Sequence, residues 1–190
     1  MARWEPNARE RLVLAALDLF AEQGYDNTTV TQIANRAGLT KTTFFRHFSD
    51  KREVLFAGQE VHSRLLADGV AAAPDSATPL EAVAAALDAL TASFTAEQRE
   101  FGPRLLTVIA DNPELQERAT FKRAALAAAL TSALGKRGVP DLTASLAADL
   151  GARAFDRAFG RWIEPSSQQT FPELAQEELQ ALRTAAMALG

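Results

Sequence analysis

The sequence predicts an all-α protein of about nine helices. Alanine is abundant across the 190 residues and strong β-formers are sparse, which favours helix. Apolar residues recur three and four positions apart in segment after segment, as on one face of a helix. Clusters of Gly, Pro, Ser and Thr separate these segments. The pattern predicts a compact N-terminal group of three helices, a connecting helix and a larger helical body.

Composition excludes several classes of site. The chain has no cysteine, so disulfides, thiolate zinc sites, iron–sulfur clusters and cysteine nucleophiles are excluded. His62 has no second histidine or Glu-x-x-His pair beside it, so we expect an exposed or packed side chain and neither a metal nor a cofactor. We find no signal-peptide pattern and no apolar stretch long enough to span a membrane. The expected location is the cytoplasm, in association with the nucleoid.

Charge is distributed unevenly along the chain. The net charge is −4, yet residues 1–52 hold eight Lys/Arg and six Asp/Glu, whereas residues 53–190 hold twelve and eighteen. A mildly basic head on an acidic body fits a polyanion that is contacted by one end only. We therefore divide the chain into a domain at 1–52 and a second domain at 53–190.

Helix-boundary residues mark the N-terminal elements. An amphipathic helix at 8–23 is followed by Gly24 as a C-cap. Thr28 or Thr29 can cap a short helix that ends at Gly38, and Thr40 can cap the next one. A fourth helix, capped by Ser49 or Asp50, is expected to begin at Lys51 and to run towards residue 70.

The body is also expected to be helical. Thr78 and Pro79 begin a helix at its cap and first position. Further helical patterns cover about 103–111, 113–135, 141–163 and 172–189.

The stretch RAGLTKTTFFRHF, residues 36–48, is both apolar and basic. Phe44 and Phe48 are four residues apart and share one helix face, which can pack on Phe20 and Ile33. The opposite face carries the cationic and hydroxyl side chains Lys41, Thr42, Thr43, Arg46 and His47. Two short helices joined by a glycine-containing turn form a helix-turn-helix. A short helix supported from behind, with donors in front, suits the DNA major groove.

Each polar residue of this stretch has a candidate partner on DNA and a simpler alternative. Lys41 and Arg46 suit guanine edges or phosphates, and the threonines suit thymine methyls, base edges and phosphates. Thr29 and Lys51 lie near helix starts, which favour phosphate. The alternative is a solvated helix face. Phe45 is either a core residue or a contact for a thymine methyl.

The helix Leu12–Phe20 and the segment GYDNTTVTQIANRAGLTKTTFFRHFSDKREVL, residues 24–55, resemble the N-terminal domain of the TetR family of bacterial repressors. The resemblance implies a homodimer on a palindromic double-stranded DNA operator. It implies base contacts from Thr31, Lys41, Thr42 and Phe45, and phosphate contacts from Thr29, Thr43, His47 and Lys51. Phe45 stands where the family usually has tyrosine, and Thr42 where glycine is frequent. The full candidate DNA-binding set is Thr29, Thr31, Thr40, Lys41, Thr42, Thr43, Phe45, Arg46, His47 and Lys51.

The resemblance also implies a small-molecule effector between helices of the body. The effector-binding candidates are Phe94, Leu105, Ile109, Phe121, Leu126, Phe155, Phe159 and Trp162, and ordinary core packing is the alternative for each. The last two helices would pair with those of a second copy. Leu142, Leu146 and Leu150 line the first of them, and Leu174, Leu179 and Leu182 line the second. Phe155 and Phe159 are candidates for both the pocket and the dimer interface.

The resulting hypothesis is a ligand-responsive DNA-binding transcriptional regulator. It would act as a repressor and be released from DNA by a small, largely apolar effector. One alternative is an effector-independent DNA-binding accessory factor. Another is a helical carrier or enzyme with a vestigial head. The enzyme is disfavoured because the sequence holds no nucleophile motif, metal-ligand pair or phosphate loop.

Overall fold

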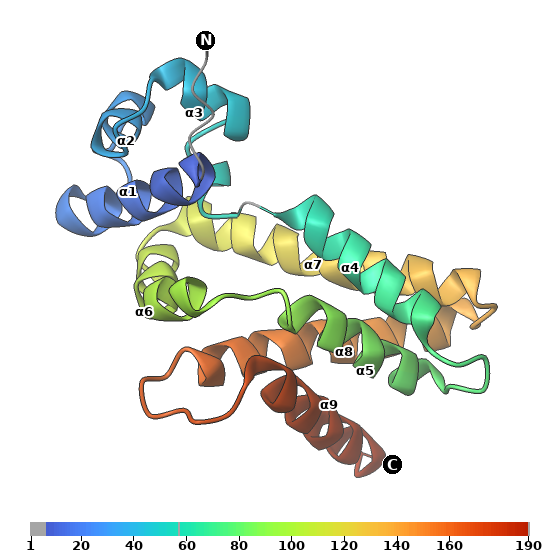
Figure 1. Cartoon of the computed structure of the whole chain (residues 1–190). Helices are drawn as coiled ribbons and strands as arrows, with labels where there is room; N and C mark the ends of the chain where they lie inside the picture. Colours follow the sequence, from blue (N-terminus) through green and yellow to red (C-terminus); the bar gives the residue numbers. More distant parts are fainter. Residues whose placement is uncertain (1–6, 57, 190) are drawn as a thin grey trace. The chain divides into compact units, whose positions relative to one another are not determined.

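The chain is entirely helical in the computed structural model, which describes residues 7–56 and 58–189. These residues contain nine α-helices, one short 3-10 helix and no strand, so the predicted all-α fold is confirmed (Figure 1). None of these helices is long and apolar enough to cross a membrane. The helices are α1 Ala8–Gln23, α2 Val30–Arg36, α3 Lys41–His47, η1 Arg52–Val54, α4 Gln59–Ala72, α5 Pro79–Thr91, α6 Ala96–Ala110, α7 Pro113–Lys136, α8 Asp141–Trp162 and α9 Phe171–Met187.

The chain forms two compact units, each with its own apolar core. The first unit comprises residues 1–57 and 101–119, and the second comprises 58–100 and 120–190. This division differs from the one drawn at residue 52, because the first core also takes in Val54, Val108 and Leu115. A division by charge could not reveal that residues 101–119 return to the first core.

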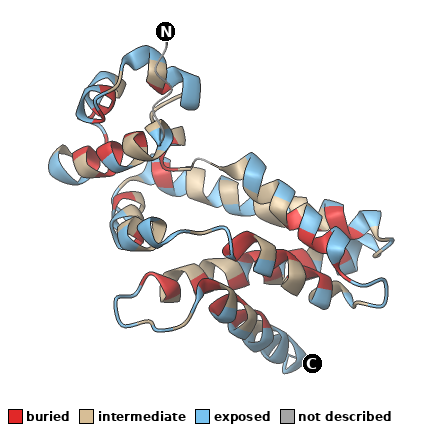
Figure 2. Cartoon of the chain, in the orientation of Figure 1, coloured by how far each residue is buried: buried red, intermediate tan, exposed pale blue. Residues whose placement is uncertain are grey.

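The core of the first unit is built from the apolar faces of α1, α2 and α3. Leu12 and Phe20 of α1 lie in one cluster with Ile33 of α2 and with Phe44 and Phe48, in and just after α3. The predicted packing of this group is therefore confirmed. Figure 2 shows buried positions on one side of α1 and exposed positions on the other.

The segment after α3 differs from its prediction. The expected continuous helix from Lys51 is instead the short helix η1 followed, after a break, by α4. Asp50 starts η1 by accepting hydrogen bonds from the backbone N–H groups of Arg52 and Glu53, at 2.8 and 3.0 Å. Gly58 then takes a φ of 103° as the N-cap of α4, a conformation outside the α-helical region and readily adopted only by glycine.

Helix α6 begins at Ala96, earlier than the predicted start near residue 103, and contains Pro103 in its interior. The side chains of Thr95 and Gln98 explain why the helix starts this early. Thr95 N–H donates to Gln98 Oε1 at 2.8 Å, and Gln98 N–H donates to Thr95 Oγ1 at 3.3 Å. This reciprocal pair is a capping arrangement that satisfies donors at a helix start, and it outweighs the helix-breaking tendency of the proline.

The second unit packs α4, α5, α8, α9 and the C-terminal part of α7 around leucine and alanine side chains. Thr78 caps α5 with Glu81 as its reciprocal partner, and Pro79 occupies the first turn, so that predicted boundary is confirmed. Leu66, Leu90, Leu134 and Leu174 are at most 1% exposed. They belong to one core cluster that includes the aromatic residues Trp162 and Phe171.

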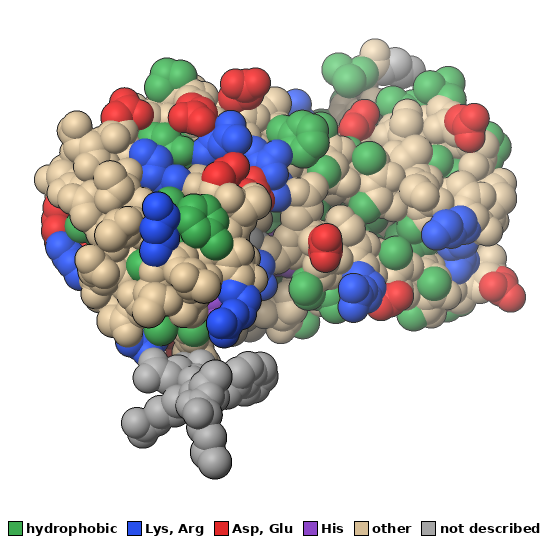
Figure 3. Space-filling view, turned by 90° about the horizontal axis from the view of Figure 1, so that it is seen from above, with side chains coloured by type: hydrophobic (Ala, Val, Ile, Leu, Met, Phe, Trp, Pro, Cys, Tyr) green, Lys and Arg blue, Asp and Glu red, His purple; other side chains and the backbone are tan. Residues whose placement is uncertain are grey.

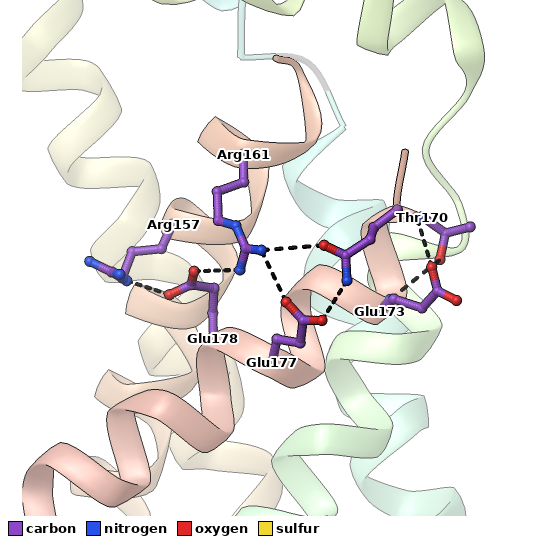
Figure 4. Close-up of polar contacts among 7 residues, drawn as sticks. Arg157, Arg161, Thr170, Glu173, Glu177 and Glu178 are labelled. Carbon is purple, nitrogen blue, oxygen red and sulfur yellow. Dashed lines mark hydrogen bonds and ion pairs between the residues drawn. The ribbon is translucent and has the colours of Figure 1, made fainter. Parts of the chain in front are cut away.

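A charged network joins α8 to α9 (Figure 4). The side chain of Glu178 is only 5% exposed, yet it accepts hydrogen bonds from both Arg157 and Arg161. Arg161 also donates to Glu177 at 3.0 Å. Burial raises the pKa of Glu178, but the hydrogen bonds from the two arginines outweigh it, so the pKa lies below its usual value of 4.5.

We expect Glu178→Gln to destabilise the protein at neutral pH by about 1–2 kcal/mol, because two arginines lose their shared carboxylate while remaining partly exposed to water. Because the pKa of Glu178 is lower in the folded protein than in the unfolded chain, its ionised carboxylate stabilises the fold fully above the unfolded-state pKa. This stabilisation weakens as the pH falls below that value. Urea unfolding at neutral pH and near pH ~4 measures the difference between variant and wild type. The difference should shrink at the acidic pH, and a constant difference would contradict this account.

Candidate nucleic-acid interface

Helices α2 and α3 are short, and each has a threonine at its start. Thr29 caps α2, because its Oγ1 accepts from Gln32 N–H at 3.2 Å while Gln32 Oε1 accepts from Thr29 N–H at 2.8 Å. Thr40 Oγ1 accepts from Thr43 N–H at 3.1 Å and caps α3. Of the two candidate caps for α2, Thr28 is buried and donates instead to Gly24 O at 2.8 Å.

The turn between α2 and α3 is fixed from α1. Gly38 has a φ of 67° in this turn, which a side chain would disfavour. Leu39 N–H donates to Ala34 O at 2.8 Å, and the guanidinium of Arg11 donates to Ala37 O. The backbone at the end of α2 is therefore held by a side chain from α1.

Helix α3 is anchored through its apolar face. Phe44 is fully buried and its ring lies 5.4 Å from that of Phe48 and 5.5 Å from that of Phe45. Phe45 itself is 49% exposed. The two interpretations of Phe45 are thus separated: its ring is not part of the core, although its edge contacts the core through Phe44.

The exposed side of α3 presents cations, a hydroxyl group and one aromatic ring. Lys41, Thr42, Phe45, Arg46 and His47 are exposed, and Thr43 is half-buried. The ammonium of Lys41 lies 5.9 Å from the centroid of the Phe45 ring, within the range of a cation–π interaction. Thr29, Thr31 and Thr40 are exposed as well. Figure 3, seen from above the view of Figure 1, shows several Lys and Arg side chains gathered among uncharged groups, with Asp and Glu side chains beside some of them.

Several cations of the first unit already have partners within the protein. Arg36 pairs with Glu22, and Arg52 pairs with Asp50 and Glu114. The ammonium of Lys51 donates to two backbone carbonyls. Within residues 7–56, the cations that lack a carboxylate or carbonyl partner are Lys41, Arg46 and Arg9.

Arg9 is a candidate that sequence reasoning missed. Its guanidinium carbon lies 5.8 Å from the ring centroid of Phe48, the residue that follows α3. It therefore lies close to the residue that follows the C-terminal end of α3. The sequence gives no spacing that links position 9 to position 48, because the contact depends on how α1 crosses α3.

The predicted effector residues do not form one cluster. Four of them form an aromatic cluster with Phe171 in the second unit: Phe94, Phe155, Phe159 and Trp162. The centroids of the rings in contact lie 4.8 to 6.4 Å apart. Leu126 packs against the same core, whereas Leu105 and Ile109 pack against the core of the first unit. Phe121 is 58% exposed.

His62, for which the sequence indicated packing or exposure, stacks on the ring of Phe94 with centroids 5.4 Å apart. Across residues 7–56 and 58–189, no group of His, Asp and Glu is arranged to hold a metal ion.

A rigidly backed short helix with donors on its outer face, joined through a glycine turn to a second short helix, defines a helix-turn-helix DNA-binding protein. Residues 12–57 match the family model described as "Bacterial regulatory proteins, tetR family". Together with the relatives below, this match shows that the N-terminal segment is similar to the DNA-binding domain of TetR-family regulators. The predicted resemblance of this segment to the TetR family is thereby confirmed.

The curated relatives are similar mainly in the N-terminal part. The transcriptional regulator TcmR of Streptomyces glaucescens is 37% identical over 82 residues, which are 43% of this chain and 36% of TcmR. The regulator BetI of Rhizobium meliloti is 36% identical over 95 residues, which are 50% of this chain and 45% of BetI. The matched stretches thus span less than half the length of these relatives.

Solved structures share the fold over nearly the whole chain. GusR of Salmonella enterica has a TM-score of 0.56 at 20% identity, covering 100% of this chain and 98% of GusR. A SmeT–triclosan complex has a TM-score of 0.57 at 21% identity, covering 94% of this chain and 90% of SmeT.

We expect Phe44→Ala to destabilise the protein by about 3–5 kcal/mol, because it removes a fully buried ring from the core that supports α3. The adjacent substitution Phe45→Ala should change stability by no more than about 0.5 kcal/mol, since that ring is half exposed. Chemical denaturation followed by circular dichroism gives both values. Equal losses in the two variants would show that Phe45 also belongs to the core.

Proposed function

We propose that this protein is a transcriptional repressor that binds a palindromic double-stranded DNA operator as a homodimer and is released by a small, largely apolar effector. The observation that carries the DNA-binding part is the exposed side of α3, where Lys41 and Arg46 stand without ionic partners on a helix fixed from behind by Phe44. Such a helix can enter the major groove without losing internal contacts.

In this proposal each exposed residue has a role that follows from its chemistry. Lys41 and Arg46 bind guanine edges or phosphates, and Thr31 and Thr42 contact base edges. The exposed ring of Phe45 packs on a thymine methyl group, which an aromatic ring without a hydroxyl can do as well as a tyrosine. The surrounding donors Thr29, Thr40, Thr43 and His47 contact phosphates, which fix the position of the helix without reading sequence.

The proposed homodimer uses the exposed apolar side of α8 and α9. Leu142 and Leu146 on α8 are 73% and 57% exposed. Leu146 also lines an open hollow of about 390 Å³ with Leu80 of α5, Leu150 of α8 and Arg183 of α9. Leu174 and Leu179 are buried in the core of their own unit, so the proposed interface is narrower than the sequence indicated.

The proposed effector would bind at the aromatic cluster of the second unit. The rings of Phe94, Phe155 and Phe159 are only partly buried, and aromatic linings favour largely apolar ligands. A protein of the same fold, SmeT, has been solved in complex with triclosan, which supports a ligand-responsive regulator. The rings contact one another, so a ligand would need to move at least one of them.

Release from DNA would follow from a difference in spacing between two recognition helices. In a dimer these helices reach two half-sites about 34–36 Å apart. An effector that favours another spacing by ~1–3 kcal/mol would weaken binding several-fold or more. The predicted continuous helix from Lys51 into the second unit is not present, so it cannot connect the two units. The chain passes from one unit to the other near residue 57 and again within α6 and within α7.

Fluorescence anisotropy with DNA from the region next to the gene, and with scrambled DNA, tests the DNA-binding proposal. Wild-type protein should prefer the natural sequence and bind more weakly as salt rises. Lys41→Ala should weaken specific binding by about 1–3 kcal/mol. Lys136→Ala, which removes an exposed lysine from the end of α7, serves as the matched control and should bind like wild type.

Equal, weak binding to both DNAs would favour the effector-independent accessory factor over a sequence-specific repressor. Selection from random-sequence DNA pools would then decide between them, because a repressor enriches one palindrome and an accessory factor enriches none.

We expect Leu146→Glu to convert a dimer to a monomer, because a carboxylate in an apolar interface loses its hydration without gaining a partner. The dimer dissociation constant should rise roughly a hundredfold or more. Sedimentation velocity gives the oligomeric state. Val61→Glu, at a position on α4 that is 49% exposed against 57% for Leu146, is the control and should remain dimeric. A dimeric Leu146→Glu variant would place the interface elsewhere.

A further inference from the structure

Lys51 has an environment that differs from that of a phosphate-binding side chain. Its ammonium donates hydrogen bonds to Tyr25 O at 2.6 Å and to Thr28 O at 3.0 Å. The same nitrogen lies 3.9 Å from the centroid of the Tyr25 ring. A lysine ammonium has three N–H donors, so two carbonyls and one aromatic face occupy all of its directions of interaction.

We propose that Lys51 is a positioning residue, which holds the segment before α2 against the segment after α3 and makes no direct contact with DNA. The inference rests on the proposed DNA-binding function, because the position that Lys51 maintains is that of the two recognition elements. It replaces the phosphate contact that the family resemblance implied for this residue.

Besides Lys51, this segment is held by the Tyr25 ring, which is buried in the core, and by hydrogen bonds to nearby residues of the chain, including one from Thr28 Oγ1 to Leu19 O at 3.4 Å. Thr28 Oγ1 donates to Gly24 O at 2.8 Å and accepts from Gln23 Nε2 at 3.1 Å. Asn27 Nδ2 donates to Gln23 O at 2.9 Å. The partners in these last three hydrogen bonds lie within five residues of one another along the chain. Lys51 is more than twenty residues away, so its hydrogen bonds, together with the packing of Tyr25 in the core, set the position of this loop relative to α3.

The location of Lys51 makes this connection geometrically effective. Helix α3 ends at His47, and η1 begins at Arg52. Thr28 directly precedes Thr29, the cap of α2. The two hydrogen bonds therefore close a ring of chain that contains both α2 and α3 and the turn between them. Without the two Lys51 hydrogen bonds, α2 could move relative to α3 while each helix kept its own N-cap.

Removal of the charge would also leave unsatisfied groups. The carbonyls of Tyr25 and Thr28 would lose a charged donor, and hydrogen bonds to charged groups are stronger than those between neutral groups. Burial lowers the pKa of Lys51, while the nearby carboxylates of Asp26 and Glu114 act in the opposite direction. An ammonium in these surroundings would have to give up its carbonyl partners before it could bind a phosphate.

Two full-length variants test the proposal, with operator DNA selected from random pools by the wild-type protein. Lys51→Met removes the ammonium and keeps the length and apolar stem of the side chain. Arg52→Met removes one positive charge from the next residue, which makes only exposed ion pairs, and controls for net charge. Anisotropy over a series of salt concentrations gives the operator affinity and its salt dependence. Hydrogen exchange of the DNA-free protein reports on amides 25–33.

The proposal predicts that Lys51→Met weakens operator binding about tenfold, while the slope of log affinity against log salt stays at the wild-type value. Amides 25–33 should exchange faster in this variant. Arg52→Met should match wild type in exchange and in affinity. The preference for operator over scrambled DNA should fall in Lys51→Met, because misplaced helices lose base contacts more than they lose general attraction to the backbone.

A direct phosphate contact would give a different result. Two lysines lost from a dimer would lower the salt slope by about 1.8 and weaken binding to both DNAs alike, which would overturn the proposal. Unchanged operator affinity, or unchanged exchange of amides 25–33, would also overturn it. If wild type showed no preference for any DNA, the proposed function itself would fail, and the exchange comparison alone would still decide whether Lys51 holds the loop.

Discussion

The burial of Phe44 is the constraint on which the exposed side of α3, the proposed DNA-contacting surface, depends. A helix of seven residues has little stability of its own, so α3 persists because its apolar face is packed between α1 and α2. The same packing determines which residues face outward. With Phe44 and Phe48 directed into the core, the helical period places Lys41, Thr42, Phe45 and Arg46 on the solvent side. The packing of the core therefore determines which side chains of α3 are exposed and available for binding.

The cations of the first unit divide into two groups with different tasks. Arg11 and Lys51 donate to backbone carbonyls at the turn after α2 and at the loop before it. Lys41 and Arg46 lack such partners and project from α3. A basic composition at 1–52 suggested a polyanion, but part of that charge satisfies carbonyls and carboxylates within the protein. The smaller, exposed part is what DNA would meet.

Much of the fold could be predicted from the sequence, because helix caps and apolar periodicity are local properties. Thr29, Thr40 and Thr78 cap helices as expected. The start of α6 is also encoded locally, in Thr95 and Gln98, although the helix was predicted to begin only near residue 103. The partners of Lys51 and Arg9 could not be predicted in this way, since a long side chain can reach many groups and the choice depends on how helices cross. The aromatic residues of the body pose the same difficulty: helical spacing shows that Phe155 and Phe159 share a face, but not whether that face meets a ligand, a second copy or the core.

Each protomer has few cations on its exposed α3 surface, which is a reason for such a protein to bind DNA as a dimer. If Lys41 and Arg46 both neutralise phosphates, one protomer releases about two counterions, which gives weak binding with only a modest salt dependence. A second protomer, held at a fixed spacing, doubles the number of contacts without a second full cost in translational and rotational freedom. Affinity then depends on the geometry between protomers more than on any single contact. In the proposed repressor, a shift in that geometry would release DNA while every residue on α3 remained in place. The precision with which α2 and α3 are held together within each protomer would then limit how well the proposed half-sites are read.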